Sequence, residues 1–227
     1  MMYTFDFSSL WAYWPDFLTG ALTTLEMTFA ATVLGLCIGV AGAIARGSRH
    51  AWLRVVAGGY VELVRNTPFL IQIFFLFFGL ASVGVRMPVL FAAVLAMVIN
   101  VGAYTTEIVR AGIEAVHPGQ IEAAESLGLS VPQVYWYVIL RPALERVYPA
   151  LTSQFVLMML SSSITSQISA EELTAAANNI QSITFRSLET YIVVALLYLV
   201  LTVLLKSGFW LLGQALFPRR RLLGTPL

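Results

Sequence analysis

The chain has 227 residues, of which 59% are hydrophobic and only 11% charged, and its mean hydropathy is +0.82. A soluble domain carries roughly 25% charged residues, so these charges are too few to cover a soluble surface. The formal net charge of +1 excludes a basic field for nucleic acid and an acidic tail. One cysteine and two histidines argue against a structural zinc or iron–sulfur site, so no metal residues are expected. The composition predicts an integral membrane protein.

Uncharged stretches long enough to cross about 30 Å of hydrocarbon as helix recur along the chain. We predict an all-α fold, with one transmembrane domain over residues 1–227. Its five spans are expected at residues 22–46, 60–82, 87–110, 147–168 and 188–214.

Two of these spans have unusual sequences. Pro68 removes a backbone hydrogen bond and predicts a break in the second span, after an amphipathic cytoplasmic lead-in that then turns into the membrane. The fourth span is the most polar of the five because it carries many Ser, Thr and Gln residues. We expect it either to line a pathway or to pack against neighbouring helices, since hydroxyls can also bond back to their own helix.

Basic residues indicate the orientation of the spans. Eleven of the 13 Lys and Arg residues fall in the connections after the first and third spans or at the end of the fifth, whereas only Arg86 and Arg186 lie in the opposite connections. Cytoplasmic segments carry the excess of such residues. The N-terminus is therefore expected outside and the C-terminus in the cytoplasm.

The longest connection, residues 111–146, is then cytoplasmic. Pro118-Gly119 predicts a turn, residues 120–127 a short helix, and Gly128 a left-handed cap that ends it.

A second helix should follow in the same connection. Ser130 with Gln133 has the spacing of a capping box, and we expect the helix to run through Leu140 and to end at Arg141-Pro142. An ordinary polar connection rarely needs so many ordered residues. The connection is therefore a candidate docking element for another protein.

Four motifs in order resemble the permease subunits of polar amino acid ABC importers, the histidine/glutamine permease-like family with an EAA loop. The motifs are Tyr60 to Pro68 with Gln72, Gly102 to Arg110, Ala115-Val116 through Gly119-Gln120, and Glu122-Ala123-Ala124 with Gly128. The resemblance runs from about Thr23 to Leu212.

This resemblance implies the transmembrane domain of an ABC type I importer in the bacterial plasma (inner) membrane. Two ATPase subunits would dock on the EAA loop, where Glu122, Ala123, Ala124 and Gly128 would couple ATP hydrolysis to transport. An extracytoplasmic binding protein would deliver the amino acid, and a second permease copy or a related permease would complete the pathway. ATP and Mg²⁺ would bind to the partner ATPase, so no cofactor is expected in this chain.

The sequence departs from the family pattern in two places. Leu140-Arg141 replaces the usual Leu-Pro, and the proline follows one position later. Many relatives carry a lysine and an acid where Leu160 and Ser161 stand, so a charged substrate contact there is in doubt. This change argues mildly against a cationic substrate held by this chain alone.

Few polar residues are available within the membrane as candidates for the substrate pathway. Asn100 lies midway along the third span, where an unsatisfied amide is costly, so it either contacts substrate or bonds a neighbouring helix. Ser161, Ser163, Thr165 and Gln167 are candidates in the fourth span. They cannot all face one pathway, because a helix turns about 100° per residue.

Charged residues at the cytoplasmic end of the third span have helical spacing. Glu107 and Arg110, and then Arg110 and Glu114, lie on one helix face, which favours a structural ion pair over substrate binding. Glu62 and Arg65 have the same spacing and the same interpretation.

In the first span, small residues recur every four positions. The residues are Ala31, Gly35, Gly39 and Ala43. They form a flat face for close packing, which fits a dimer contact and packing within the chain equally well.

Two other classes of function fit the sequence less well. A membrane enzyme needs a cluster of catalytic or metal-binding residues, yet the two histidines lack such spacing, and Lys206 lacks the glycines of a P-loop. No catalytic residue is therefore expected. A self-sufficient secondary transporter or channel for a small polar solute would predict strongly ionisable residues in mid-membrane, and the sequence has none there.

Overall fold

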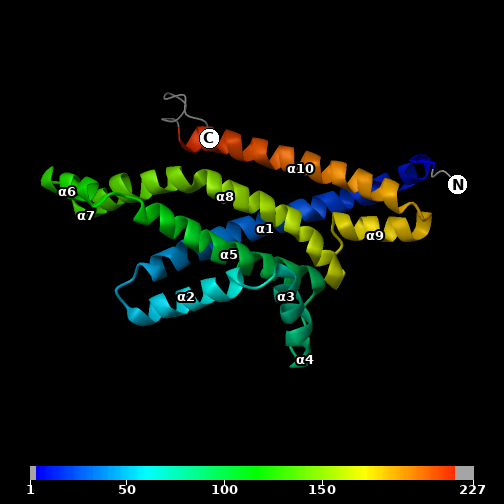
Figure 1. The fold of residues 1–227 in the computed structure, drawn as a ribbon, viewed down its shortest axis with the longest axis horizontal. Helices are drawn as coiled ribbons and strands as arrows, with labels where there is room; N and C mark the ends of the chain where they lie inside the picture. Colours follow the sequence, from blue (N-terminus) through cyan, green and yellow to red (C-terminus); the bar gives the residue numbers. More distant parts are fainter. Residues whose placement is uncertain (1–3, 218–227) are drawn as a thin grey trace. The chain divides into compact units, whose positions relative to one another are not determined.

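The computed structural model describes residues 4–217, so Arg219, Arg220 and Arg221 of the orientation prediction lie outside the described residues. Within that range every regular element is helical (Figure 1). The α-helices are α1 (Trp14–Arg46), α2 (Ala51–Arg65), α3 (Phe69–Phe74), α4 (Leu80–Ser82), α5 (Val89–Glu114), α6 (Pro118–Ser126), α7 (Val131–Gln133), α8 (Arg141–Ser161), α9 (Leu173–Thr184) and α10 (Ser187–Leu216). Two 3₁₀ helices, η1 (Ser8–Tyr13) and η4 (Ser162–Ile168), and two π helices, η2 (Phe75–Gly79) and η3 (Val134–Leu140), complete the order.

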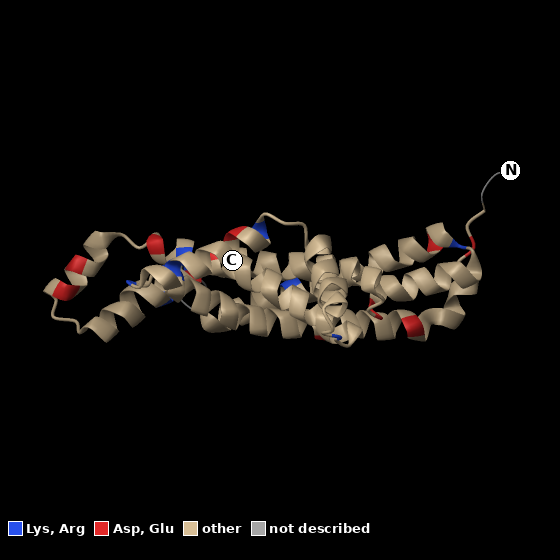
Figure 2. Ribbon diagram, turned by 90° about the horizontal axis from the view of Figure 1, so that it is seen from below, with Lys and Arg blue, Asp and Glu red and all other residues tan. Residues whose placement is uncertain are grey.

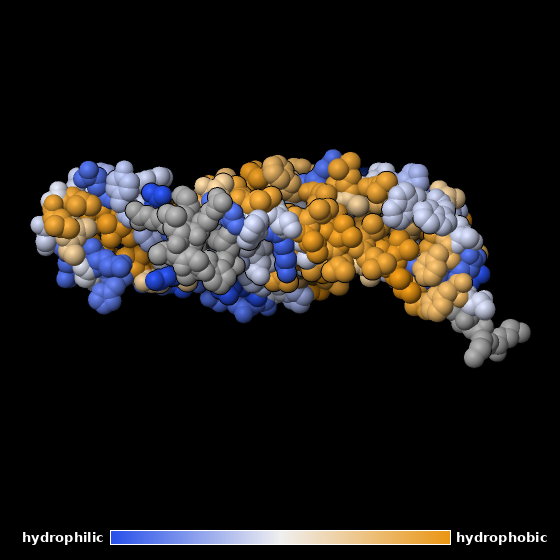
Figure 3. All heavy atoms as spheres, turned by 90° about the horizontal axis from the view of Figure 1, so that it is seen from above, coloured by the Kyte–Doolittle hydropathy of each residue, from blue (hydrophilic) through white to orange (hydrophobic). Residues whose placement is uncertain are grey.

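Four helical stretches of the described residues are long and apolar enough to cross a membrane. They are Ser8–Arg46, Val89–Glu114, Val131–Ile168 and Ser187–Leu216. A fifth span is formed if Ala51–Arg65 and Phe69–Ser82, which are separated by the expected break at Pro68, count as one. Figure 2 shows few charged residues along the long helices, and Figure 3 shows apolar side chains over much of one face. The predicted all-α fold with about five spans is confirmed, while the limits of the spans in the membrane and their orientation stay predictions.

Contacts divide the chain into two compact units. Of the described residues, unit 1 comprises 4–33, 67–98 and 156–207, and unit 2 comprises 34–66, 99–155 and 208–217. Of the described Lys and Arg residues, Arg86, Arg186 and Lys206 belong to unit 1 and the other seven to unit 2. Basic side chains are therefore concentrated in one of the two units.

Unit 1 has its apolar core around helix α9. Phe17 of α1, Met159 of α8, and Leu173 and Ile180 of α9 are fully buried in one cluster with residues of α10. This core holds α9, which the sequence analysis did not predict.

In unit 2 the small-residue face of α1 packs on α5. A side chain added at Gly35 or Gly39 would collide with Val101 or Thr105 of α5, respectively. Ala43, one turn further along α1, is buried as well. Packing within the chain therefore uses this part of the face.

The predicted end of the second loop helix at Arg141-Pro142 is wrong. Helix η3 passes directly into α8, and one helical stretch runs from Val131 to Ile168. Proline inside an α-helix lacks an N–H donor and clashes with the carbonyl four residues earlier. The π geometry of η3 shifts the ladder by one residue, as the bond from the Arg141 N–H to the Trp136 carbonyl shows, and this shift accommodates Pro142.

We predict that Gly39→Val destabilises the protein, because a branched side chain cannot fit against Thr105. Overpacking of this kind costs about 1–3 kcal/mol. The thermal unfolding midpoint in detergent should fall by several degrees. Gly208→Val is the matched control, because nothing lies within 4 Å of a side chain added at Gly208. Equal midpoints for the two variants would contradict the packing of α1 on α5.

Candidate functional site

Helix α6 in unit 2 is the short helix expected in the cytoplasmic connection. His117 caps its start, because its Nδ1 accepts a hydrogen bond from the Gly119 N–H at 3.1 Å, and Pro118 occupies the first helical position. Gly128 ends it with a φ of +78°, as predicted. Two backbone bonds close this end: the Gly128 N–H donates to the Glu125 carbonyl, and the Leu129 N–H to the Ala124 carbonyl. Such a Schellman motif requires the left-handed residue, which glycine adopts without steric cost.

The expected coupling residues do not all face the same way. Glu122, Ala123 and Gly128 are exposed, whereas Ala124 is buried. Leu127, just before the cap, is 81% exposed. Helix α6 thus presents one face outward and is anchored to unit 2 through the other.

After Gly128 the chain re-enters a helix at the expected capping box. The Ser130 N–H donates to Oε1 of Gln133 at 2.8 Å, and α7 begins there. Exposed large side chains continue along this stretch at Val131, Tyr135, Trp136 and Tyr137. The two helices meeting at Gly128 therefore form an exposed corner rich in apolar side chains.

In unit 1 the polar fourth span ends as the 3₁₀ helix η4, in which four hydroxyls bond back to the helix. Ser162, Ser163, Thr165 and Ser166 each donate to the carbonyl three residues earlier, at 2.6–2.8 Å. A 3₁₀ helix has three residues per turn, so residues three apart lie on the same face. The hydroxyls are therefore satisfied within the helix itself.

This periodicity separates the four candidates of the fourth span. Thr165 is fully buried together with Ser162. Ser161 is half-buried and Gln167 is exposed. These two residues share a second face of the helix because they lie six positions apart. Ser163 lies on the third face. Only Ser161 and Gln167 among the four can face one pathway together.

Asn100 lies on α5 in unit 2, and its side chain is 6% exposed. Glu107 and Arg110 follow two turns later on the same helix, with Nη2 of Arg110 2.8 Å from Oε2 of Glu107. Arg110 also pairs with Glu114. The expected Glu62–Arg65 pair is wrong, because Glu62 accepts a hydrogen bond from Asn66, and Arg65 lies 3.9 Å from Glu107.

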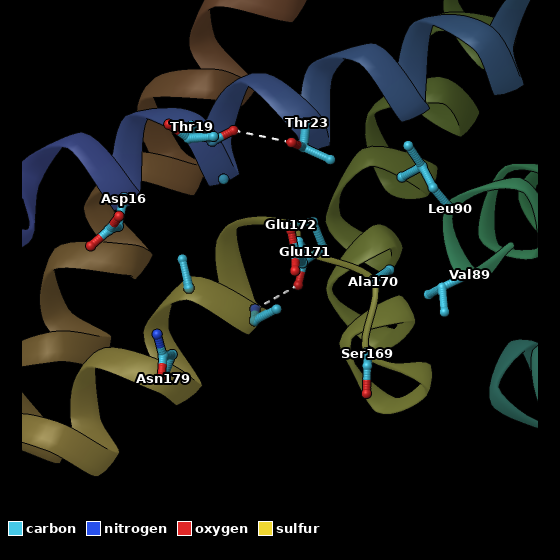
Figure 4. A pocket seen from close by; sticks show the side chains of 13 residues that line it. Asp16, Thr19, Thr23, Val89, Leu90, Ser169, Ala170, Glu171, Glu172 and Asn179 are labelled. Atoms are coloured by element: carbon cyan, nitrogen blue, oxygen red, sulfur yellow. Dashed lines mark hydrogen bonds between the residues drawn. The ribbon is translucent and has the colours of Figure 1, made fainter.

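Unit 1 also contains a pocket of about 680 Å³ that the sequence analysis missed (Figure 4). It lies between α1, the start of α5, the turn after η4 and α9. The polar side chains that line it include Asp16, Thr19, Thr23, Ser169, Glu171 and Asn179. Carboxylates but neither Lys nor Arg are among the described residues that line it. The pocket suits a small polar molecule that carries a positive group.

Glu172, the residue directly before α9, also lines this pocket (Figure 4). Its carboxylate accepts hydrogen bonds from the N–H groups of Thr174 and Ala175, both at 2.9 Å, and from the Tyr198 hydroxyl at 2.7 Å. Burial raises the pKa of the Glu172 carboxyl above its usual value, although these hydrogen bonds oppose the shift. Glu172 is therefore the N-cap that fixes the start of α9 in unit 1.

Helix α9 is also held against α1. The Leu173 N–H donates to Oγ1 of Thr24 at 3.3 Å, and a side chain added at Gly20 would stand 2.9 Å from the Leu173 Cα. The absence of a side chain at Gly20 permits this close approach. The signal in the sequence was the alanine run of residues 175–177, since alanine is the strongest helix former, whereas Glu172 is an unusual N-cap residue.

Comparisons with known proteins give the family. The model of the family described as "Binding-protein-dependent transport system inner membrane component" matches residues 35–217. The chain belongs to this family. It is accordingly a multi-pass protein of the inner membrane, as predicted.

Named relatives are similar over most of the chain. The nopaline transport system permease protein NocM of Agrobacterium fabrum is 35% identical, covering 83% of this chain and 82% of the relative. The glutamine transport system permease protein GlnP of Escherichia coli is 36% identical, covering 88% and 93%.

Solved structures are similar as well. A crystal structure of an amino acid ABC transporter with histidines matches with a TM-score of 0.87 and 39% identity over 94% of this chain and 100% of that one. The inward-facing MetNI methionine ABC transporter matches at a TM-score of 0.72 and 21% identity over 88% and 95%, respectively, and shows the same fold. The predicted type I importer fold is confirmed.

We predict that Glu172→Ala loosens α9, because two backbone N–H groups and the Tyr198 hydroxyl lose their acceptor. Loss of a cap with buried partners should cost about 1–3 kcal/mol. Amide hydrogen exchange of residues 173–184 should become faster. The matched control is the exposed neighbour in Glu171→Ala, which should leave exchange unchanged. Unchanged hydrogen exchange in Glu172→Ala would show that Glu172 does not stabilise the start of α9.

Proposed function

We propose that the chain is the transmembrane permease subunit of an ATP-driven ABC importer for a polar amino acid. The observation that carries the proposal is the exposed helix α6, capped at Gly128, in a chain whose residues 35–217 match the permease family. The amino acid class is supported by relatives named for nopaline, octopine and glutamine transport. An amino acid ABC transporter with histidines is the structural counterpart with 39% identity.

The chain itself is not the ATPase in this proposal. The sequence around Lys206 lacks the glycines with which a P-loop holds phosphate, so ATP and Mg²⁺ bind to partner ATPase subunits. A binding protein outside the membrane delivers the substrate, in keeping with the family description. A second permease copy or a related permease completes the translocation pathway.

Helix α6 couples ATP hydrolysis on the partner subunit to substrate transport through this chain. Its exposed residues Glu122 and Ala123, with Leu127 beside them, offer a surface on which an ATPase subunit docks. The buried Ala124 anchors the other side of α6 to unit 2, so that force on the helix reaches the spans. Closure of the ATPases then switches the permease between inward-facing and outward-facing states by rigid-body movement.

The substrate pathway uses polar side chains in both units. In unit 2 we propose Asn100, which is buried within the third span. In unit 1 we propose Ser161 and Gln167, which share one face of the η4 region, whereas Ser163 lies on another face. Thr165 is fully buried and supports this helix from within.

The pocket of unit 1 is proposed as the vestibule where substrate enters. With the N-terminus outside, Asp16 near the start of α1 lies toward the outer surface. The carboxylates of Asp16 and Glu171 attract the ammonium group that every amino acid carries, and the hydroxyls of Thr19, Thr23 and Ser169 offer hydrogen bonds. The α-carboxylate of an amino acid finds no Lys or Arg among the described lining residues, so a group outside this pocket must be its partner.

Purification of the tagged protein from its native membrane in mild detergent tests the function. We expect an ATPase with a P-loop to co-purify, together with either no second permease or one of similar size. The complex should take up amino acid into liposomes only with ATP and the binding protein. A protein that comes out alone in several detergents and still moves substrate would be a secondary transporter or channel, and the proposal would fail.

We predict that Gly128→Val uncouples the importer. A branched residue in the left-handed region costs about 1–2 kcal/mol, so the capped end of α6 should change its path. Substrate taken up per ATP hydrolysed should fall by roughly fivefold or more, while membrane insertion stays intact. Gly128→Asn should retain most coupling, because asparagine tolerates this conformation.

Gly84→Val is the matched control for Gly128→Val. Gly84 also has a positive φ, +92°, and nothing lies within 4 Å of a side chain added at either glycine. The backbone strain is therefore similar, but Gly84 lies in the connection before α5 and outside the coupling loop. Normal coupling in Gly128→Val would refute the role of α6.

A further inference from the structure

Glu107 of α5 is approached by arginines from three helices of unit 2. Oε1 of Glu107 lies 3.2 Å from Nη2 of Arg46, the last residue of α1. Its Oε2 lies 2.8 Å from Nη2 of Arg110 on α5 itself and 3.9 Å from Nη1 of Arg65, the last residue of α2. One carboxylate therefore connects the ends of α1 and α2 to α5.

This carboxylate differs from its neighbour Glu114 in burial and in partners. The Glu107 side chain is 15% exposed, whereas that of Glu114 is 61% exposed and pairs with Arg110 alone. Charges that are partly buried are screened much less by salt than exposed ones. Among the residues that the structure describes, no carboxylate other than Glu107 lies within ion-pair distance of Arg46 or Arg65. Without Glu107, both guanidinium groups would lose their counter-ion.

Helix α2 is attached to α5 by two further contacts. The Tyr60 hydroxyl donates a hydrogen bond to the Ile99 carbonyl at 2.6 Å. The Arg65 guanidinium lies 5.3 Å from the centre of the Tyr104 ring, within the range of a cation–π interaction. The ion pair of Arg65 with Glu107 is therefore the charged part of a longer contact between α2 and α5.

The end of α1 is fitted to α2 at the same level. A side chain added at Gly58 of α2 would stand 2.5 Å from Nη1 of Arg46. Glycine at this position leaves room for the Arg46 guanidinium on its way to Glu107. The ends of α1 and α2 thus meet α5 at the Glu107 carboxylate, to which α1 contributes Arg46 and α2 contributes Arg65.

The position of Glu107 along the chain connects this cluster to the coupling loop. Helix α5 ends at Glu114, and α6 begins at Pro118. Helix α2 leads through the break at Pro68 into α3. Because residues 115–117 alone separate α6 from α5, a movement of α6 reaches the end of α5 directly, and the contacts of Glu107 determine which helices follow that end.

We propose that Glu107 is a positioning residue for coupling, which fixes the ends of α1 and α2 to α5 so that all three follow α6 as one body. This inference rests on the proposed importer function. Arginines outnumber carboxylates in the cluster, so no other described carboxylate can take the place of Glu107 as the counter-ion of Arg46 and Arg65. A purely stabilising ion pair would affect unfolding but not the yield of transport per ATP.

The test uses the complete complex in liposomes and measures substrate taken up per ATP hydrolysed. Glu107→Gln keeps the size of the side chain and removes its charge. The uptake per ATP should fall by roughly fivefold or more, the range of a coupling free energy between two sites. Glu107→Asp, which keeps the charge, should restore part of the loss. Glu114→Gln is the matched control, since it removes a carboxylate of the same cluster that contacts Arg110 alone, and should keep the wild-type ratio.

The thermal unfolding midpoint and the amount of bound ATPase are measured on the same samples. A lower ratio with an unchanged midpoint and unchanged ATPase binding supports the proposal. A lower midpoint with a wild-type ratio in the assembled fraction would overturn it, because Glu107 would then only stabilise the fold. Absence of ATP-driven uptake by the wild-type complex would refute the importer function itself.

Arg65→Gln provides a second variant if Glu107→Gln does not assemble. The Arg65 side chain is 40% exposed, so its replacement leaves no fully buried charge behind. We expect a lower ratio in Arg65→Gln, and a double variant with Glu107→Gln no worse than the single Glu107→Gln, because residues of one network are not additive. A wild-type ratio in Arg65→Gln would overturn the link between α2 and α5.

Discussion

The interior of a bilayer offers no hydrogen-bond partner to a peptide group, and this constraint accounts for most of the structure. Each span must satisfy its own N–H and C=O groups, so within the described residues the chain is helical throughout its apolar stretches. Where the i to i−4 backbone hydrogen bonds of the α-helix are interrupted, other hydrogen bonds take their place. The π helix η3 accommodates Pro142, and the four hydroxyls of η4 occupy carbonyls of their own helix. Helix η3 lies within the proposed coupling loop of residues 111–146, and η4 carries side chains of the proposed pathway.

Close approach between helices depends on small residues rather than on apolar bulk. Lipid tails are as apolar as leucine, so packing within the membrane relies on surface fit. Gly35 and Gly39 bring α1 against α5 in unit 2, and Gly20 brings α1 against the start of α9 in unit 1. Because the backbones come so near, polar groups can then reach one another: Thr24 accepts the Leu173 N–H, and Arg46 passes Gly58 to reach Glu107.

Basic residues are distributed unequally between the two units, and carboxylates occur in both. Unit 1 gathers carboxylates around a pocket without lining Lys or Arg, which suits the ammonium group of a substrate. Unit 2 holds most of the described arginines, and three of them lie around Glu107, near the start of the proposed coupling loop. In the proposed function, carboxylates of unit 1 attract the substrate, and a carboxylate of unit 2, Glu107, holds the arginines that surround it.

The sequence by itself determined the membrane class, the all-α fold, the break at Pro68, the left-handed cap at Gly128 and the family, because composition, chain length and local backbone chemistry depend on nearby residues. Tertiary structure alone decided that Arg65 pairs with Glu107 instead of Glu62, that Ala124 is buried beside the exposed Ala123, and that the small face of α1 packs within the chain. It also decided the pocket beside α9 and the continuation of the helix past Pro142. Such contacts join residues far apart in the chain, so they depend on how helices pack, which no local pattern contains.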